Sequence, residues 1–128
     1  MIALPLPPSV NAMYRNVPGV GRVKTSDYKA WERKACAALT FASWDMPGRP
    51  YNVTLRFNVN HQSDIDNRVK PVLDLLVKHK VIDGDQWVNA LHIYRDRNIE
   101  GCVVEFGEPH FCTIGEAANR VLAKVIVE

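Results

Sequence analysis

Carboxylates gather around one stretch of the sequence, HQSDIDNRVKPVLDLLVKHKVIDGDQW, residues 61 to 87. Asp64 and Asp66 flank a single apolar residue, and residues two apart on an extended chain point to the same side. Two carboxylates that close repel each other by roughly 1 kcal/mol or more, depending on the local dielectric, and without compensation one would take up a proton. A bound divalent cation removes that cost, and ligands that are all oxygens suit Mg²⁺ or Mn²⁺.

Two further residues extend this pattern. Asp85 follows an apolar helical segment that returns the chain across the molecule, so it is placed to supply a third carboxylate. Lys70 lies one helical turn after Asp66, on the same side. There its ammonium group can hold a phosphate or stabilise charge on an attacking or leaving oxygen.

The same residues also fit a purely structural role. An acidic residue before a helix is a common cap, and Asp-Gly-Asp is a common turn. The residues alone leave open a phosphodiesterase, a metal-dependent kinase and a calcium-binding domain.

The size and composition of the chain indicate one domain over residues 1–128. Hydrophobic residues make up 47% of the 128 residues, enough to bury a core. We expect a cytoplasmic protein without a membrane partner, because no apolar run approaches the roughly 18 residues of a membrane span and the N-terminus lacks a signal-peptide pattern. We expect the cysteines, whose odd count lacks metal-type spacing, to be reduced thiols: Cys36, Cys102 and Cys112.

The expected fold is α+β, a small mixed sheet with helices packed on it. Residues 51–59 alternate apolar and polar, which is typical of a half-buried strand. Residues 16–24 are rich in Gly and Pro and should form a loop or hairpin. The other expected strands are 2–6, 87–95 and 101–106, the last two as an antiparallel hairpin. The expected helices run from an N-cap at Ser26 to about Ser43, from Asn67 to Lys78, and after a capping box of Thr113 and Glu116. Pro71 has no amide proton, so it either lies in the first turn of its helix or kinks the helix there.

The runs DIDNRVKPVLDLL and VIDGDQWV resemble the signature of the RusA-type Holliday-junction resolvases, crossover junction endodeoxyribonucleases common in phages and prophages. The start, LPLPPSVNAMYRN, is similar to that family's N-terminal strand and Pro-Pro-Ser-x-Asn turn, and the resemblance covers Leu4 to about Phe106. It implies cleavage of four-way DNA junctions, with Mg²⁺ as cofactor, by a homodimer. The family's essential acids and lysine match Asp64, Asp66, Asp85 and Lys70.

Two departures from the family pattern concern DNA affinity and metal binding. Well-known members carry an arginine run before the two aspartates, where this chain has residues 60–63, Asn-His-Gln-Ser. Members also often have adjacent acids where this chain has Gly84 and Asp85. Asp83, one place earlier, either substitutes in part or is only a turn residue.

DNA affinity must then come from elsewhere, and the segment from Tyr14 to Lys34 is the candidate. It holds six basic residues against two acidic ones, although the net charge of the whole chain is only +2. An aromatic residue and an arginine beside the turn can stack on or bind a DNA strand. The candidate DNA-binding residues are Asn11, Tyr14, Arg15, Arg22 and Lys24. Trp31 is interpreted as a core or dimer-interface residue, and Asp74 as structural or solvated.

Three functions remain on these grounds. The leading one is a Mg²⁺-dependent, structure-selective endonuclease in DNA recombination and repair. The second is a protein that binds junctions or single strands without cutting them, favoured if Gly84 in place of an acid weakens metal binding. The third is a metal-stabilised interaction module with no role on DNA.

Overall fold

The computed structural model describes residues 1–44 and 48–107. In these ranges the chain forms an α+β fold, as the sequence predicts, with a four-stranded mixed sheet, a separate two-stranded hairpin and two α-helices. The strands are β1 (Ile2–Leu4), β2 (Tyr14–Val17), β3 (Gly21–Lys24), β4 (Tyr51–Phe57), β5 (Val88–Arg95) and β6 (Cys102–Phe106). The helices are α1 (Ser26–Phe41) and α2 (Val69–Lys78), with 3₁₀ turns η1 (Val10–Ala12), η2 (Asp66–Arg68) and η3 (Asp85–Trp87).

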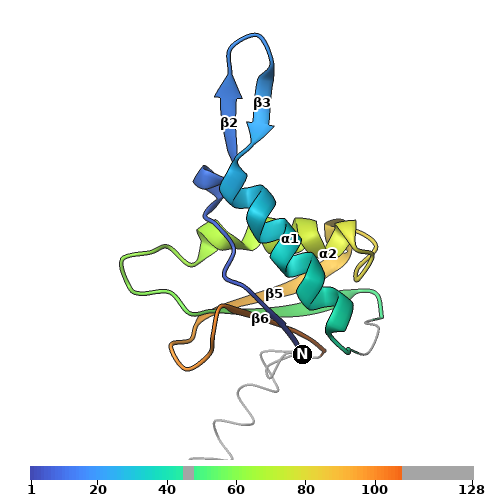
Figure 1. Ribbon diagram of the computed structural model, residues 1–128. Helices are drawn as coiled ribbons and strands as arrows, with labels where there is room; N and C mark the ends of the chain where they lie inside the picture. The colour runs from blue at the N-terminus through green and yellow to red at the C-terminus, as the bar shows by residue number, and fades with distance from the viewer. Residues whose placement is uncertain (45–47, 108–128) are drawn as a thin grey trace, which may run out of the picture.

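Strand β4 lies at the centre of the fold. The strand order is β1-β6-β4-β5, with β4 parallel to β5 and antiparallel to β6. The apolar alternation predicted for residues 51–59 is confirmed, because Val53, Leu55 and Phe57 are fully buried while the residues between them are partly exposed. Helices α1 and α2 lie side by side over one face of the sheet (Figure 1).

The predicted antiparallel hairpin of residues 87–95 and 101–106 is wrong. Strands β5 and β6 lie on opposite sides of β4, and residues 96–101 cross its end. The Asp96 amide donates to the Phe57 carbonyl and the Asn58 amide donates to the Gly101 carbonyl, each at 2.9 Å. Six residues reach up to about 20 Å, whereas two strand spacings need only about 10 Å. A short connection is therefore long enough to let β4 lie between them.

Helix α1 begins one residue earlier than predicted because its cap is Thr25, not Ser26. The Thr25 hydroxyl accepts a hydrogen bond from the Tyr28 amide at 3.2 Å and donates to the Ala12 carbonyl at 2.6 Å. The helix ends at Phe41, two residues before the predicted end. Thr25 therefore both caps α1 and fastens it to the turn that precedes β2.

Residues 14–24 form the two-stranded hairpin β2–β3, which stands away from the rest of the molecule (Figure 1). The loop or hairpin predicted for residues 16–24 is thus a hairpin. Gly19 and Gly21 have φ values of +76° and +99°, which side chains rarely adopt, so these two glycines allow the tight reversal.

Helix α2 connects β4 to the parallel strand β5, as a crossover between parallel strands requires. It was predicted over Asn67–Lys78, but the first residues of that range belong to η2. Of the two alternatives for Pro71, the structure shows the position in the first turn of α2. Its buried face consists of Pro71, Val72, Leu75 and Leu76.

Other sequence predictions meet the structure as follows. The first strand ends at Leu4, and Trp31 belongs to the core, where its indole N–H donates to the Pro5 carbonyl at 2.8 Å. Cys36 and Cys102 are free thiols. Cys112 and the capping box of Thr113 and Glu116 lie outside the described residues. Within the described ranges, neither helix has the length and apolar character needed to cross a bilayer.

Candidate active site and nucleic-acid interface

Asp64 and Asp66 lie on the exposed segment that leads from β4 into α2. Asp66 is the first residue of η2, and both side chains are exposed to solvent. The Asn67 amide lies 3.4 Å from the Asp64 carboxylate, at the long end of hydrogen-bond distance. The two aspartates therefore stand immediately before α2, as the sequence predicts.

Two arginines hold this segment in place. The Arg95 guanidinium on β5 donates to the carbonyls of Asn60 and Ser63, the latter at 2.9 Å. The Arg68 guanidinium on η2 donates to the Pro7 carbonyl. Turn η1, which carries the exposed Asn11, contacts η2 and α2 as a result. The Pro-Pro-Ser-x-Asn turn thus lies beside the start of α2, next to the segment that carries the two aspartates.

Charged residues of alternating sign recur every four residues along η2 and α2: Asp66, Lys70, Asp74 and Lys78. The Lys70 ammonium lies 3.3 Å from the Asp74 carboxylate, one turn further along the helix. The next residue of the series, Lys78, lies 3.2 Å from the Glu32 carboxylate of α1. Asp74, predicted to be structural or solvated, is therefore the ion-pair partner of Lys70. Its spacing from Lys70 was a signal for this contact in the sequence.

Asp85 opens η3, which packs against α2. It is exposed, and it lines a hollow together with Asp74, Val77, Lys78, Asp83, Gly84 and Gln86. A β-carbon added to Gly84 would overlap the Gln86 side chain, which therefore occupies the space that a larger residue at position 84 would need. The hollow brings Asp85 near Asp74.

Asp83 lines the same hollow, but unlike Asp85 it also forms an ion pair within the described part of the chain. The Arg49 guanidinium donates to its carboxylate at 2.7 Å, and its amide donates to the Tyr51 hydroxyl at 3.2 Å. Arg49 also lies over the Trp87 ring, 4.8 Å from its centroid. These contacts favour the interpretation of Asp83 as a turn residue.

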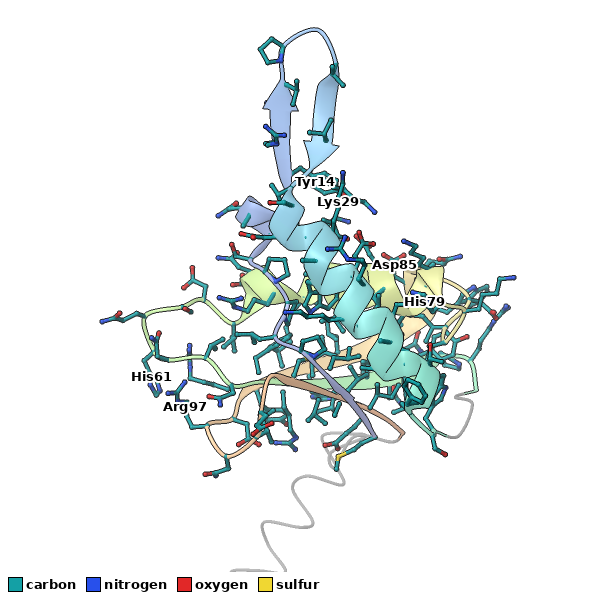
Figure 2. The ribbon with its side chains drawn as sticks, in the orientation of Figure 1. Tyr14, Lys29, His61, His79, Asp85 and Arg97 are labelled. Carbon is teal, nitrogen blue, oxygen red and sulfur yellow. The ribbon has the colours of Figure 1, made fainter. Side chains whose placement is uncertain are left out.

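The three predicted metal ligands do not form a single cluster. Among the described residues, no three His, Cys, Asp or Glu side chains are close enough to hold one ion together. In the view of Figure 2, His61, on the loop before Asp64, and Asp85 lie on opposite sides of α1. The donor chemistry nevertheless fits a hard cation. All three are exposed carboxylates, and within residues 1–44 and 48–107 none of them forms an ion pair.

The predicted DNA-binding residues of the hairpin lie on both of its faces. Directly paired residues of an antiparallel ribbon share a face, so the pairs Tyr14–Lys24 and Asn16–Arg22 share one face. Arg15 pairs with Val23 on the other face.

Glu32 is a residue whose role the sequence did not reveal. Its side chain is 14% exposed and accepts hydrogen bonds from Lys24 at 3.0 Å and from Lys78 at 3.2 Å. Burial by itself would raise the pKa of Glu32, but the hydrogen bonds from the two lysines outweigh it and the pKa is lowered. Glu32 therefore connects the hairpin, α1 and α2. Its partners are 8 and 46 residues away in the sequence, too far for a local sequence pattern to predict the contacts.

Comparison with known proteins identifies one family. The family model described as endodeoxyribonuclease RusA matches residues 5–105. This range agrees with the resemblance seen between Leu4 and Phe106, and it includes η1, the hairpin, both helices and η3. No curated protein matches the chain.

Proposed function

The chain belongs to the RusA endodeoxyribonuclease family, and from this premise we propose that it is a Mg²⁺-dependent nuclease that resolves four-way DNA junctions by paired symmetric nicks. The observation that carries the proposal is the family match over residues 5–105, which contains the two aspartates before α2, Lys70 and the late Asp85. Its role would lie in DNA recombination and repair.

We assign the Mg²⁺ ion to Asp64, Asp66 and Asp85, which lie apart in this structure and would have to approach one another to hold a single ion. Mn²⁺ could substitute because it also prefers oxygen ligands. When bound, Mg²⁺ would supply Lewis-acid chemistry, namely a more acidic water molecule and neutralisation of charge on the scissile phosphate. Lys70, which is exposed at the start of α2, would stabilise the charge that develops on the phosphate oxygens. The carboxylate of Asp74, 3.3 Å from the Lys70 ammonium, would act as a positioning residue for it.

DNA would be bound by the hairpin and the turn before it. We assign this role to Asn11, Tyr14, Arg15, Arg22 and Lys24. The Arg22 guanidinium lies over the Tyr14 ring, 4.1 Å from its centroid, so an aromatic surface and a cation are presented together. Such a pair can contact both bases and phosphates of a DNA strand.

The active protein would be a homodimer. One chain carries one set of these carboxylates, and a four-way junction requires two nicks on opposing strands. A closed two-fold dimer supplies two sites whose symmetry matches that of the junction. Sedimentation equilibrium at micromolar protein tests this part, since a mass near 14.5 kDa without DNA would exclude a preformed dimer.

A labelled four-way junction, incubated with and without Mg²⁺, tests the proposed function. Paired symmetric nicks that depend on Mg²⁺ are the expected result. A band shift without nicks would support the protein that binds junctions or single strands without cutting, which Gly84 in place of an acid and the separated carboxylates also favour. If the junction is neither nicked nor shifted, the remaining candidate is a metal-stabilised interaction module with no role on DNA.

A further inference from the structure

One face of the hairpin continues onto α1. The Tyr14 ring packs edge-on against the Tyr28 ring, with centroids 5.7 Å apart. The Lys24 ammonium lies 5.2 Å from the centroid of the Tyr28 ring and 3.0 Å from the Glu32 carboxylate. Arg22, stacked on Tyr14, extends the same face outward. The contacts therefore hold this hairpin face in a defined position relative to α1.

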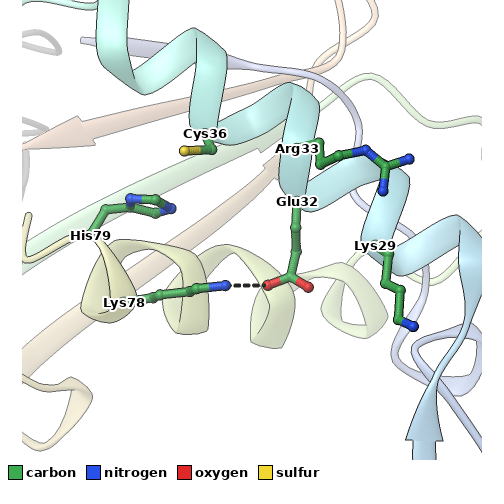
Figure 3. Close-up of a pocket in the computed structure, with 6 residues that line it drawn as sticks. All are labelled: Lys29, Glu32, Arg33, Cys36, Lys78 and His79. Atoms are coloured by element: carbon green, nitrogen blue, oxygen red, sulfur yellow. Dashed lines mark hydrogen bonds and ion pairs between the residues drawn. The ribbon is translucent and has the colours of Figure 1, made fainter.

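From Glu32 the charged surface crosses to α2. A hollow of about 560 Å³ lies between the two helices, lined by Lys29, Glu32, Arg33, Cys36, Lys78 and His79 (Figure 3). Three of these residues are cations and one is an acid, and the acid already pairs with Lys78. The hollow therefore carries a net positive charge.

Lys78 also belongs to the neighbouring hollow, which Asp74 and Asp85 line. Figure 2 shows the same order, with Tyr14 and Lys29 where the hairpin joins α1, and His79 and Asp85 beside α2. Basic side chains thus lie along the surface from the hairpin, across Glu32, to the hollow that contains a candidate catalytic carboxylate. We name this surface the basic track, consisting of Arg22, Lys24, Lys29, Arg33, Lys78 and His79.

We propose that the basic track binds the sugar–phosphate backbone of one junction strand and leads it to the hollow of Asp74 and Asp85. The inference rests on the proposed function and adds the α1–α2 hollow to the DNA-binding surface. A DNA strand presents regularly spaced negative charges, and cations arranged in a row meet several of them at once. Glu32 holds two of these cations, Lys24 and Lys78, so these two side chains are positioned before DNA arrives.

Two lysines of α1 provide a matched test. Lys29 and Lys34 are both exposed and carry the same charge on the same helix, but only Lys29 lines the hollow. Junction binding is measured by fluorescence anisotropy in EDTA, so that cleavage cannot interfere. We expect Lys29→Ala to weaken binding about tenfold and to lower the log–log salt slope by about 0.9, the value for removal of one neutralised phosphate. Lys34→Ala should change affinity less than about threefold.

Equal effects in the two variants, or no effect in either, would contradict the proposal that the basic track binds DNA. The same titration separates this failure from failure of the proposed function. If the unchanged protein does not bind the junction at all, the proposed function itself fails. If it binds and cuts but Lys29→Ala behaves as Lys34→Ala does, only the track is wrong.

Cys36 offers a direct footprint, because its partly exposed thiol lies in the hollow. Burial raises the pKa of the Cys102 thiol to about 12, so that group stays protonated and unreactive. In a Cys112→Ser background, alkylation therefore reports on Cys36. Saturating junction DNA should slow its alkylation at least about fivefold, since access controls the rate. An unchanged rate, in a protein that binds the junction, would place the strand elsewhere.

Discussion

The acidic residues and the basic track are held in opposite ways. Asp64, Asp66 and Asp85 are exposed: Asp66 and Asp85 open the 3₁₀ turns η2 and η3, and Asp64 lies just before η2. Within the described residues, the long contact from Asn67 to Asp64 is their one side-chain hydrogen bond. Lys24 and Lys78 instead share the carboxylate of Glu32. The carboxylates can therefore be replaced with little disturbance of the interior, whereas the track is part of the folded structure. Substitutions should separate catalysis from binding and from stability accordingly.

The largest effect is expected at the carboxylates. Asp64→Asn, Asp66→Asn and Asp85→Asn should each reduce junction cleavage by at least about 100-fold, because each would remove one of the proposed metal ligands. Binding should be equal or stronger, since less negative charge then faces the phosphates, and the thermal unfolding temperature should not change. Asp83→Asn is the matched control, because Asp83 pairs with Arg49. Normal cutting by Asp85→Asn together with loss of cutting by Asp83→Asn would shift the site by two residues.

The next largest effects on cleavage are expected from substitutions of Lys70 and Asp74. Lys70→Ala is expected to abolish or greatly reduce cleavage with the fold intact. Asp74→Asn should lower single-turnover cleavage about tenfold without weakening binding, because the Lys70 ammonium is then without its charged partner at 3.3 Å. Asp74→Glu should restore part of the rate if the carboxylate positions Lys70. Equal rates for the Asn and Glu variants would instead show that Asp74 acts only through the fold.

The hairpin should affect affinity more than catalysis. Replacing Arg15, Arg22 and Lys24 together with Ala should weaken junction binding and reduce the salt slope by about 0.9 for each phosphate that is no longer neutralised. Among single variants, Arg22→Ala should weaken binding more than Arg15→Ala, because Arg22 shares its face with Tyr14 and Lys24 while Arg15 lies on the other face. A salt slope unchanged in the triple variant would assign DNA binding to another surface.

The smallest effect is expected on stability, at Glu32. Glu32→Gln should lower the free energy of unfolding by about 1 kcal/mol at neutral pH, since it weakens hydrogen bonds to Lys24 and Lys78. The pKa of Glu32 is lowered in the folded protein, so this stabilisation is complete above its unfolded value of 4.5 and is lost as pH falls through the folded pKa. Denaturant unfolding of both proteins from pH 7 to pH 3 should show the difference shrink. A difference that stays constant would exclude charge as its cause.

Local patterns in the sequence predicted local structure well. The alternation along residues 51–59 indicated a half-buried strand, and every second residue of β4 is buried. The apolar stripe indicated a helix that ends at Lys78, and α2 ends at that residue. The aspartates were predicted to precede that helix, and they do. Strand and helix periods are properties of neighbouring residues, so a sequence reports them directly.

Tertiary structure alone decided which segments meet. Nothing in residues 87–106 indicated that β4 would lie between β5 and β6. The pairing of strands depends on contacts with segments that are distant in the sequence. The face of the hairpin that carries Arg22 followed from its register with Tyr14 and Asn16. Glu32 and Lys78 are 46 residues apart in sequence, and their ion pair exists only because α1 and α2 pack side by side. Such contacts depend on how helices and sheet share one core, and no short-range pattern encodes that arrangement.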